Sequence, residues 1–275
     1  MSGREDPLVT IVIPHWQVRE MITLCLRSIR RFTRDVPYEV IVVDNGSKDE
    51  SLDYLRSLKW IRLIERGDET PSYWVRAMGT ALDFGIREGR GRYLLIMHTD
   101  VVILREGWLR RLIDAIESDP RHAAAGTDKL EVRSPFRAWW KRTFDEKRIK
   151  AWFRRVLLRD RRAVIPERPR CPRDFCALYR LDVLRRHELS FLQKRFSAGE
   201  SMYLDLVDRG YSAAMIPVPE MMQYIEHIAH GTAALRPGER GLDHGRTQRK
   251  SERRLNALLS RPLIRELQED ASLDQ

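Results

Sequence analysis

A polar triplet, His98-Thr99-Asp100, interrupts an otherwise apolar stretch that runs from Tyr93 to Ile103. An apolar run this short, preceded by Gly91, predicts a strand that is covered on both faces of a sheet. Ligands of open α/β sheets bind outside the carboxyl ends of the strands, so His98 and Asp100 could share a cation. The alternative is a capping role for Asp100, because aspartate is a common turn former.

The segments before and after this strand predict the strands and helices that surround it. Apolar runs predict strands over Val9–Ile13, Glu39–Val43 and Trp60–Glu65. Helices are predicted over Met21–Arg31, Asp49–Leu58, Tyr73–Arg87 and Trp108–Ile116, and a terminal helix over Ser251–Glu269 with an interruption at Pro262. Strand, helix and strand in this order form right-handed βαβ units. The sequence therefore predicts an α/β protein.

Polar residues end the first two predicted strands: Pro14 and His15 follow one, and Asp44 and Asn45 follow the other. No Gly-x-Gly-x-x-Gly motif follows the first strand, and no Walker loop is present, which excludes the usual dinucleotide and P-loop sites. A metal at the strand ends, with arginines around it, is the natural way to hold phosphates instead.

Composition indicates a globular protein that is not disordered: 275 residues, 43% hydrophobic and 33% charged. The first seven residues are charged where a signal peptide is apolar, and no apolar run approaches the roughly 20 residues that span a bilayer, so we expect a cytoplasmic location. The three cysteines are too few for a disulfide framework or a four-cysteine zinc site.

A formal charge of +10 indicates an anionic partner, and most of the excess is local. Residues 137–162 hold eleven Lys or Arg against three Asp or Glu. Within them, Ile149, Trp152, Phe153, Val156 and Leu157 form one apolar face on a basic helix, which is typical of an interfacial helix on anionic lipid. We therefore expect peripheral binding to the inner face of a membrane and no nucleic acid. Packing of this face on its own domain is the alternative.

Several motifs in order resemble family 2 glycosyltransferases of the GT-A fold, over most of Leu8 to Thr232. They are Thr10–Trp16, Glu39–Ser47, Arg76–Ala81, Gly91–Val101, Phe175–Arg180, Phe196–Glu200 and His227–Thr232. The resemblance implies a mixed, mostly parallel sheet flanked by helices. We expect a GT-A domain over residues 1–232, with a basic aromatic insertion at 133–173 and a helical tail at 233–275 that serves packing or a homo-oligomer contact.

The activity implied by the resemblance is an inverting, metal-dependent transfer of a hexose from a nucleotide-diphosphate donor to a glycan or lipid-linked acceptor hydroxyl, with Mn²⁺ or Mg²⁺ as cofactor. Residues carried over as donor-binding are Pro14, His15, Asp44, Asn45, Arg76, His98, Thr99 and Asp100. His98 replaces the first acid of the family's Asp-x-Asp metal motif, and Asp100 keeps the last. His227 or His230 is expected to be a further metal ligand.

Glu200 is the predicted general base, because the family's base occupies this motif position and an acceptor hydroxyl at neutral pH is a poor nucleophile. We expect it at the start of a helix from Ser201 to Arg209. A carboxylate there is also stabilised by the helix dipole, so a structural role is the alternative for Glu200. A non-catalytic protein that binds nucleotide sugars or a membrane surface is the alternative function.

Overall fold

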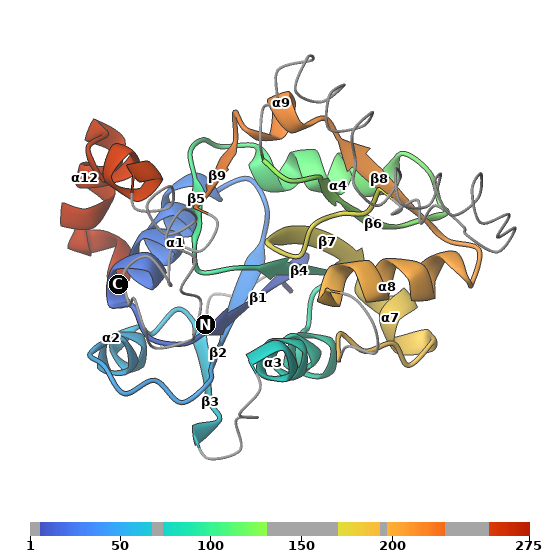
Figure 1. Cartoon of the computed structure of the whole chain (residues 1–275), viewed down its shortest axis with the longest axis horizontal. Helices are drawn as coiled ribbons and strands as arrows, with labels where there is room; N and C mark the ends of the chain where they lie inside the picture. Colours follow the sequence, from blue (N-terminus) through green and yellow to red (C-terminus); the bar gives the residue numbers. More distant parts are fainter. Residues whose placement is uncertain (1–5, 68–73, 131–169, 193–196, 229–252) are drawn as a thin grey trace, which may run out of the picture. The chain divides into compact units, whose positions relative to one another are not determined.

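The computed structural model describes residues 6–67, 74–130, 170–192, 197–228 and 253–275 (Figure 1). The chain divides into two compact units, one formed by residues 1–130 with 171–275 and the other by 131–170. All elements given below belong to the first unit. The predicted basic insertion at 133–173 therefore lies almost wholly outside the described residues.

Strands and helices alternate through the first half of the chain. The strands are β1 (Val9–His15), β2 (Tyr38–Asp44), β3 (Arg62–Glu65), β4 (Tyr93–Met97), β5 (Val101–Ile103), β6 (His122–Thr127), β7 (Cys176–Arg180), β8 (Ser212–Ile216) and β9 (Ile225–His227). The helices are α1 (Arg19–Phe32), α2 (Ser51–Ser57), α3 (Trp74–Glu88), α4 (Trp108–Glu117), α7 (Leu181–Arg186), α8 (Ala198–Val207), α9 (Val218–Met221) and α12 (Pro262–Glu269), followed by the 3-10 helix η2 (Ala271–Asp274).

Seven strands form one sheet in the order β3-β2-β1-β4-β7-β6-β8. Strands β3, β2, β1 and β4 are parallel, β7 is antiparallel to both of its neighbours, and β6 and β8 are parallel. The predicted fold class, a mixed and mostly parallel sheet flanked by helices, is confirmed. Strands β5 and β9 form a separate antiparallel pair, which we call the β5–β9 ribbon.

Helices cover both faces of the large sheet (Figure 1). Alternate strand residues point to opposite faces, so Ile11 and Ile13 join one apolar core while Val12 joins the other. The first core packs against α1, α2 and α4, and the second against α3, α7 and α8. The helices predicted over Met21–Arg31 and Trp108–Ile116 are confirmed as α1 and α4, and each buries an apolar face. The buried residues of these faces include Ile22, Cys25, Leu26, Ile29, Trp108, Leu109, Leu112, Ile113 and Ile116.

The predictions were incomplete after α4. Strand β6 contains Ala123, Ala124 and Ala125, and alanine is a poor strand former, so local sequence did not indicate a strand there. The predicted helix over Ser201–Arg209 was wrong at its start. Helix α8 begins at Ala198, which places Glu200 inside the first turn.

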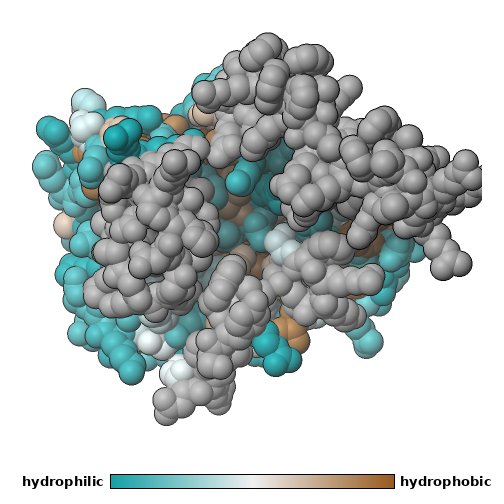
Figure 2. All heavy atoms as spheres, in the orientation of Figure 1, coloured by the Kyte–Doolittle hydropathy of each residue, from teal (hydrophilic) through white to brown (hydrophobic). Residues whose placement is uncertain are grey.

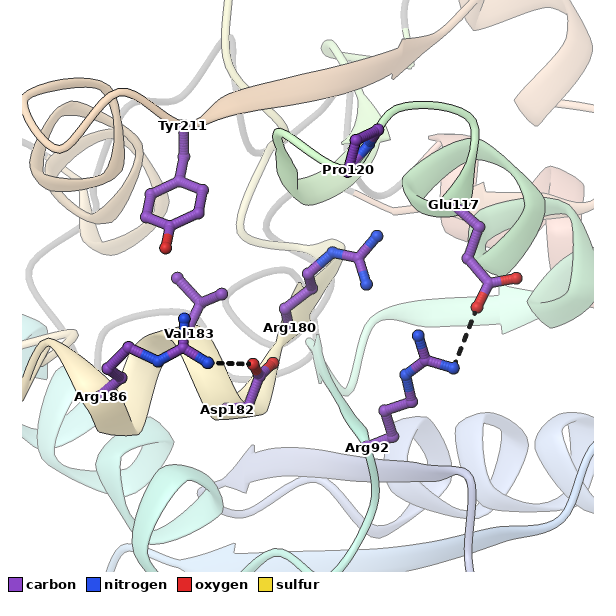
Figure 3. Close-up of a pocket in the computed structure, with 8 residues that line it drawn as sticks. All are labelled: Arg92, Glu117, Pro120, Arg180, Asp182, Val183, Arg186 and Tyr211. Carbon is purple, nitrogen blue, oxygen red and sulfur yellow. Dashed lines mark hydrogen bonds and ion pairs between the residues drawn. The ribbon is translucent and has the colours of Figure 1, made fainter.

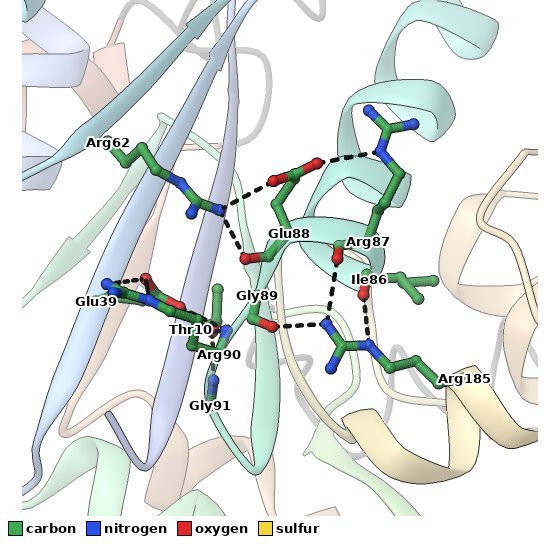
Figure 4. Close-up of polar contacts among 10 residues, drawn as sticks. All are labelled: Thr10, Glu39, Arg62, Ile86, Arg87, Glu88, Gly89, Arg90, Gly91 and Arg185. Atoms are coloured by element: carbon green, nitrogen blue, oxygen red, sulfur yellow. Dashed lines mark hydrogen bonds and ion pairs between the residues drawn. The ribbon is translucent and has the colours of Figure 1, made fainter. Parts of the chain in front are cut away.

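A polar network fixes the loop that enters β4, at the amino edge of the sheet (Figure 4). The Thr10 hydroxyl donates to Glu39 at 2.8 Å and accepts from the backbone N–H of Gly91 at 2.9 Å. A Cβ at Gly91 would lie 2.5 Å from the Thr10 nitrogen, so only glycine allows this close approach. Arg185 donates to the carbonyls of Ile86 and Gly89 at the end of α3. These contacts fix where β4, and hence the polar residues after it, begins.

The final described segment is helical over residues 253–259 and again in α12, and Pro262 begins α12 as its first helical residue. The predicted interruption at Pro262 is confirmed. Helix α12 packs beside α1 (Figure 1). Within the described ranges, no helix is long and apolar enough to cross a membrane. On the face drawn in Figure 2 the described surface is mainly hydrophilic.

Candidate active site

Three potential metal ligands meet after the carboxyl end of β4. Nδ1 of His98 lies 3.8 Å from Oδ1 of Asp100, and Nε2 of His227 lies 3.3 Å from the same oxygen. One ligand atom from each residue can be chosen so that all lie within 4.8 Å of one another. Asp100 is 7% exposed, and the two histidines are half-buried. The structure therefore brings together two predicted ligands, Asp100 and His227, with His98.

The β5–β9 ribbon makes this meeting possible. Val101 pairs with His227, and the backbone N–H of Ile228 donates to the Asp100 carbonyl at 3.0 Å. The segment before β7 completes the frame: the His98 N–H donates to the Phe175 carbonyl at 3.0 Å, and the Phe175 ring stacks on His227 with centroids 4.4 Å apart. Phe175 is thus a site residue to which sequence reasoning assigned no role, although it stands directly before a strand.

The residues present fit a divalent cation. Ligands in neighbouring octahedral positions around a small divalent ion are about 3 Å apart, close to the 3.3 and 3.8 Å observed here. Nε2 of His98 is buried and has no hydrogen-bond partner among the described residues. Two imidazoles and one carboxylate are a recognised donor set for divalent transition metals. His230, the other predicted ligand, lies outside the described residues.

The ends of β1 and β2 form a second polar cluster, because His15 and Asp44 pair in register. Nε2 of His15 lies 2.9 Å from the Ser51 hydroxyl, and His15 is only 1% exposed. Asp44 is also 1% exposed, and its Oδ2 accepts from the N–H groups of Gly46 and Ser47, both at 3.0 Å. In this arrangement both side chains fix the strand-end loops. Their predicted contact with the donor stays a prediction.

His15 makes stability depend on pH. Burial lowers its pKa to about 4, although the nearby charges of Asp44 and Asp49 act to raise it. An unfolded histidine has a pKa of about 6.5, so the unfolded chain binds a proton below that pH while the folded chain does not until about pH 4. The contribution of His15 to the free energy of unfolding should therefore be largest above pH 6.5 and fall by up to about 1.4 kcal/mol per pH unit below it.

Denaturant unfolding at pH 7.5, 6.5 and 5.5 measures this slope. His15→Gln, which cannot take up a proton, should show a flatter dependence than the wild type over the same range. Equal slopes in the two proteins would contradict a neutral, buried His15.

Arg66 reaches the end of β2, and the donor contact predicted for Arg76 stays a prediction. Arg66 is 6% exposed and donates to Oδ1 of Asn45 at 2.9 Å and to the Ala77 carbonyl at 3.0 Å. Arg76, in the first turn of α3, is exposed. The available signal for Arg66 was its position directly after β3. Pro14 and Thr99, the remaining predicted donor contacts, are half-buried at the ends of β1 and β4.

Glu200 is 6% exposed in the first turn of α8. A Cβ at the preceding Gly199 would lie 3.2 Å from the Pro172 carbonyl, so the start of α8 lies close to the segment that leads into β7. The same segment carries Phe175, which contacts His98 and His227. Glu200 and the histidine–aspartate cluster thus border one short stretch of chain. Burial, with a smaller contribution from the Glu200 charge, raises the pKa of Cys171 to about 11.

A cavity of about 620 Å³ lies at the opposite ends of the strands from the histidine–aspartate cluster (Figure 3). Arg92 stands before β4 and Arg180 ends the antiparallel β7, so the cavity is at the amino edge of the parallel strands. Two of the arginines that line it already have partners within the protein. Arg92 pairs with Glu117 at 3.4 Å, and Arg180 donates to two backbone carbonyls. This cavity is not the candidate active site.

Comparison with known proteins decides the family. The family model described as glycosyl transferase family 2 matches residues 10–187. The chain belongs to glycosyl transferase family 2. Its match spans β1 to β7 and includes His98, Asp100 and Phe175, but it ends before Glu200 and His227.

Individual relatives of this family 2 chain cover it in part. It is 29% identical over 148 residues to a PGL/p-HBAD biosynthesis glycosyltransferase of Mycobacterium bovis, which is 52% of this chain and 54% of the relative. It is 28% identical over 115 residues to the uncharacterized protein y4gI of Sinorhizobium fredii, which is 39% of this chain and 12% of that protein. The chain thus spans about half the length of the mycobacterial relative, and less of the other.

Among solved structures, the mannosyltransferase PcManGT of Pyrobaculum calidifontis, in complex with GDP-Man and Mn²⁺, aligns with a TM-score of 0.56 and 18% identity. The alignment covers 98% of this chain and 74% of that protein. At this identity the likeness shows a shared fold.

Proposed function

We propose that this family 2 member transfers a sugar from a nucleotide-diphosphate donor to an acceptor hydroxyl with inversion. The observation that carries the proposal is the meeting of His98, Asp100 and His227 at the carboxyl ends of the strands, where α/β sheets bind their ligands. Membership of glycosyl transferase family 2 and the mycobacterial glycosyltransferase relative support the reaction class. The proposed sugar is a hexose, in keeping with the GDP-Man bound by the structural neighbour.

The proposed ligands for a divalent cation are His98, Asp100 and His227. A cation bound there would neutralise the diphosphate that departs from the sugar. Two imidazole nitrogens disfavour Mg²⁺, which prefers oxygen ligands, so we propose Mn²⁺. His230 stays a candidate for a further ligand.

Glu200 is the proposed base. In direct displacement, the acceptor oxygen forms a bond to the anomeric carbon while the bond from that carbon to the diphosphate breaks. Glu200 would take the acceptor's proton as this happens, since the base must act on the side opposite the departing group. Its position beside the Pro172 to Phe175 segment, which also borders the proposed metal ligands, supports this role.

Donor recognition is assigned to the ends of β1, β2 and β3. Asn45 and Arg66, which are hydrogen-bonded to each other, are the proposed contacts for the base, ribose or phosphates. His15 and Asp44 would act mainly by fixing the loops around them, because each is 1% exposed.

Thermal melting with a panel of nucleotide sugars, with and without Mn²⁺, tests the proposal. A ligand at 100 times its Kd adds about 2.7 kcal/mol, which should raise the Tm by about 5 °C or more. The correct donor should do so with Mn²⁺ and less with Mg²⁺, and should then be consumed when acceptors are added. A donor that binds but is neither transferred nor hydrolysed would point to a non-catalytic binding protein.

We also propose that residues 137–162 bring the protein to an anionic membrane surface. The support is in the sequence alone: a net charge of +8 in this window and the apolar face from Ile149 to Leu157. Each basic residue near such a surface contributes on the order of 1 kcal/mol. A lipid-linked acceptor would then be within reach.

Vesicle flotation checks the membrane proposal. The protein should float with vesicles of acidic lipid at low salt, remain behind with neutral vesicles, and be released by high salt. Changing Arg148, Lys150, Arg154 and Arg155 to Glu should abolish flotation and leave donor binding intact. Wild-type protein that stays in the soluble fraction at low salt would indicate that the apolar face is covered by protein.

A further inference from the structure

The β5–β9 ribbon is short, and two of the proposed metal ligands lie at its ends. Each of its strands has three residues, and an isolated two-stranded ribbon is marginally stable at best in water. Asp100 stands directly before β5, and His227 is the last residue of β9. Whatever packs on the ribbon therefore helps to fix the distance between these two side chains.

One apolar cover of the ribbon comes from residues 253–275. Val102 in β5 and Ile228 after β9 are both buried in a single cluster with residues of this segment. The segment's buried members in the cluster are Leu255, Leu258, Ile264 and Leu267. Val18, which leads into α1 from the β1 end, belongs to the same cluster. The segment thus shares an apolar cluster with Val102, two residues after Asp100, and with Ile228, directly after His227.

Polar contacts anchor the segment to β9 and to α1. Arg261 forms an ion pair with Glu226, the residue of β9 beside His227. Arg27 of α1, 7% exposed, donates from Nε and Nη2 to the two carboxylate oxygens of Asp274 at 2.9 and 2.6 Å. Tyr54 donates to Asp274 at 2.9 Å as well. A bidentate pair with a buried arginine fixes orientation as well as distance.

We propose that residues 253–275 are a positioning element for the metal site: held by Arg27 and Asp274, they press the β5–β9 ribbon into the register that brings His227 to Asp100. This inference rests on the proposed role of His98, Asp100 and His227 as metal ligands. Asp274 and Arg261 touch neither substrate nor metal, so they are positioning residues that act through the ribbon.

The test uses the full chain and two readouts well below the melting temperature: the Kd for Mn²⁺ alone, from electron paramagnetic resonance, and hydrogen exchange of the Ile228 amide. Asp274→Ala and Arg261→Ala should each weaken Mn²⁺ binding by roughly three- to tenfold, since partners beyond the ligands tune metal affinity. Both should also speed exchange at Ile228, whose amide donates to the Asp100 carbonyl.

Glu266→Ala is the matched control. It removes an ion pair of 2.9 Å between the same segment and Arg31 of α1, away from the ribbon, and should change neither readout. A merely structural role would lower the Tm of Asp274→Ala without changing the Kd for Mn²⁺. If Asp274→Ala fails to fold, the half-exposed Arg261 still gives a folded variant for the comparison.

The outcomes separate the two proposals. Wild-type affinity and exchange in Asp274→Ala and Arg261→Ala would overturn the positioning role. A wild type that binds no Mn²⁺ would overturn the metal site, and exchange at Ile228, which needs no metal, would then decide alone whether the segment holds the ribbon.

Discussion

Asp100→Ala should reduce sugar transfer by roughly three orders of magnitude or more. Asp100 is the shared point of the cluster, since Nδ1 of His98 and Nε2 of His227 both lie within 3.8 Å of its Oδ1. It is also the anion among the three proposed ligands. Losing several kcal/mol of charge stabilisation at the departing diphosphate corresponds to a rate loss of this size.

The measurement is steady-state transfer from the donor found by thermal melting, together with the Kd for Mn²⁺. Both should be impaired in Asp100→Ala, while circular dichroism should report a folded protein. Asp182→Ala is the control: this carboxylate pairs with Arg186 at the opposite edge of the sheet and should be neutral in both assays. Full activity of Asp100→Ala, or full activity of the wild type in excess chelator, would contradict the metal role.

Glu200→Gln should lower the turnover rate by roughly two to four orders of magnitude, which is the usual contribution of a general base. Glutamine keeps the shape of the side chain and cannot accept the acceptor's proton. Donor affinity should stay within about twofold, because a base that acts on the acceptor adds little to donor binding. Single-turnover transfer and equilibrium donor binding measure the two quantities separately.

Asp205→Asn in the same helix is the matched control for Glu200→Gln, and it should leave transfer unchanged. The opposite pattern for Glu200→Gln, weaker donor binding with an unchanged turnover rate, would assign Glu200 to binding or to the helix start. A structural role was the alternative from sequence, since the helix dipole stabilises an acid in the first turn of a helix.

The sequence by itself determined the elements whose patterns are local. Alternating and continuous apolar runs predicted β1, β2 and β4, and the helical period predicted α1 and α4. These patterns indicate which face of an element is buried, and in the structure those faces pack in the two apolar cores. The parallel direction of the first strands also followed, because a strand–helix–strand unit joins parallel strands.

Tertiary structure decided which polar side chains meet. His227 reaches Asp100 because β9 pairs with β5, and three-residue strands carry too little pattern to predict that pairing. Arg66 bonds Asn45 and the Ala77 carbonyl because of where α3 packs on the sheet, which periodicity does not report. His15 and Asp44 were placed at the right strand ends, but only the packed structure reveals that both are 1% exposed. Position along a strand is set locally, whereas pairing and burial depend on contacts between segments far apart in the chain.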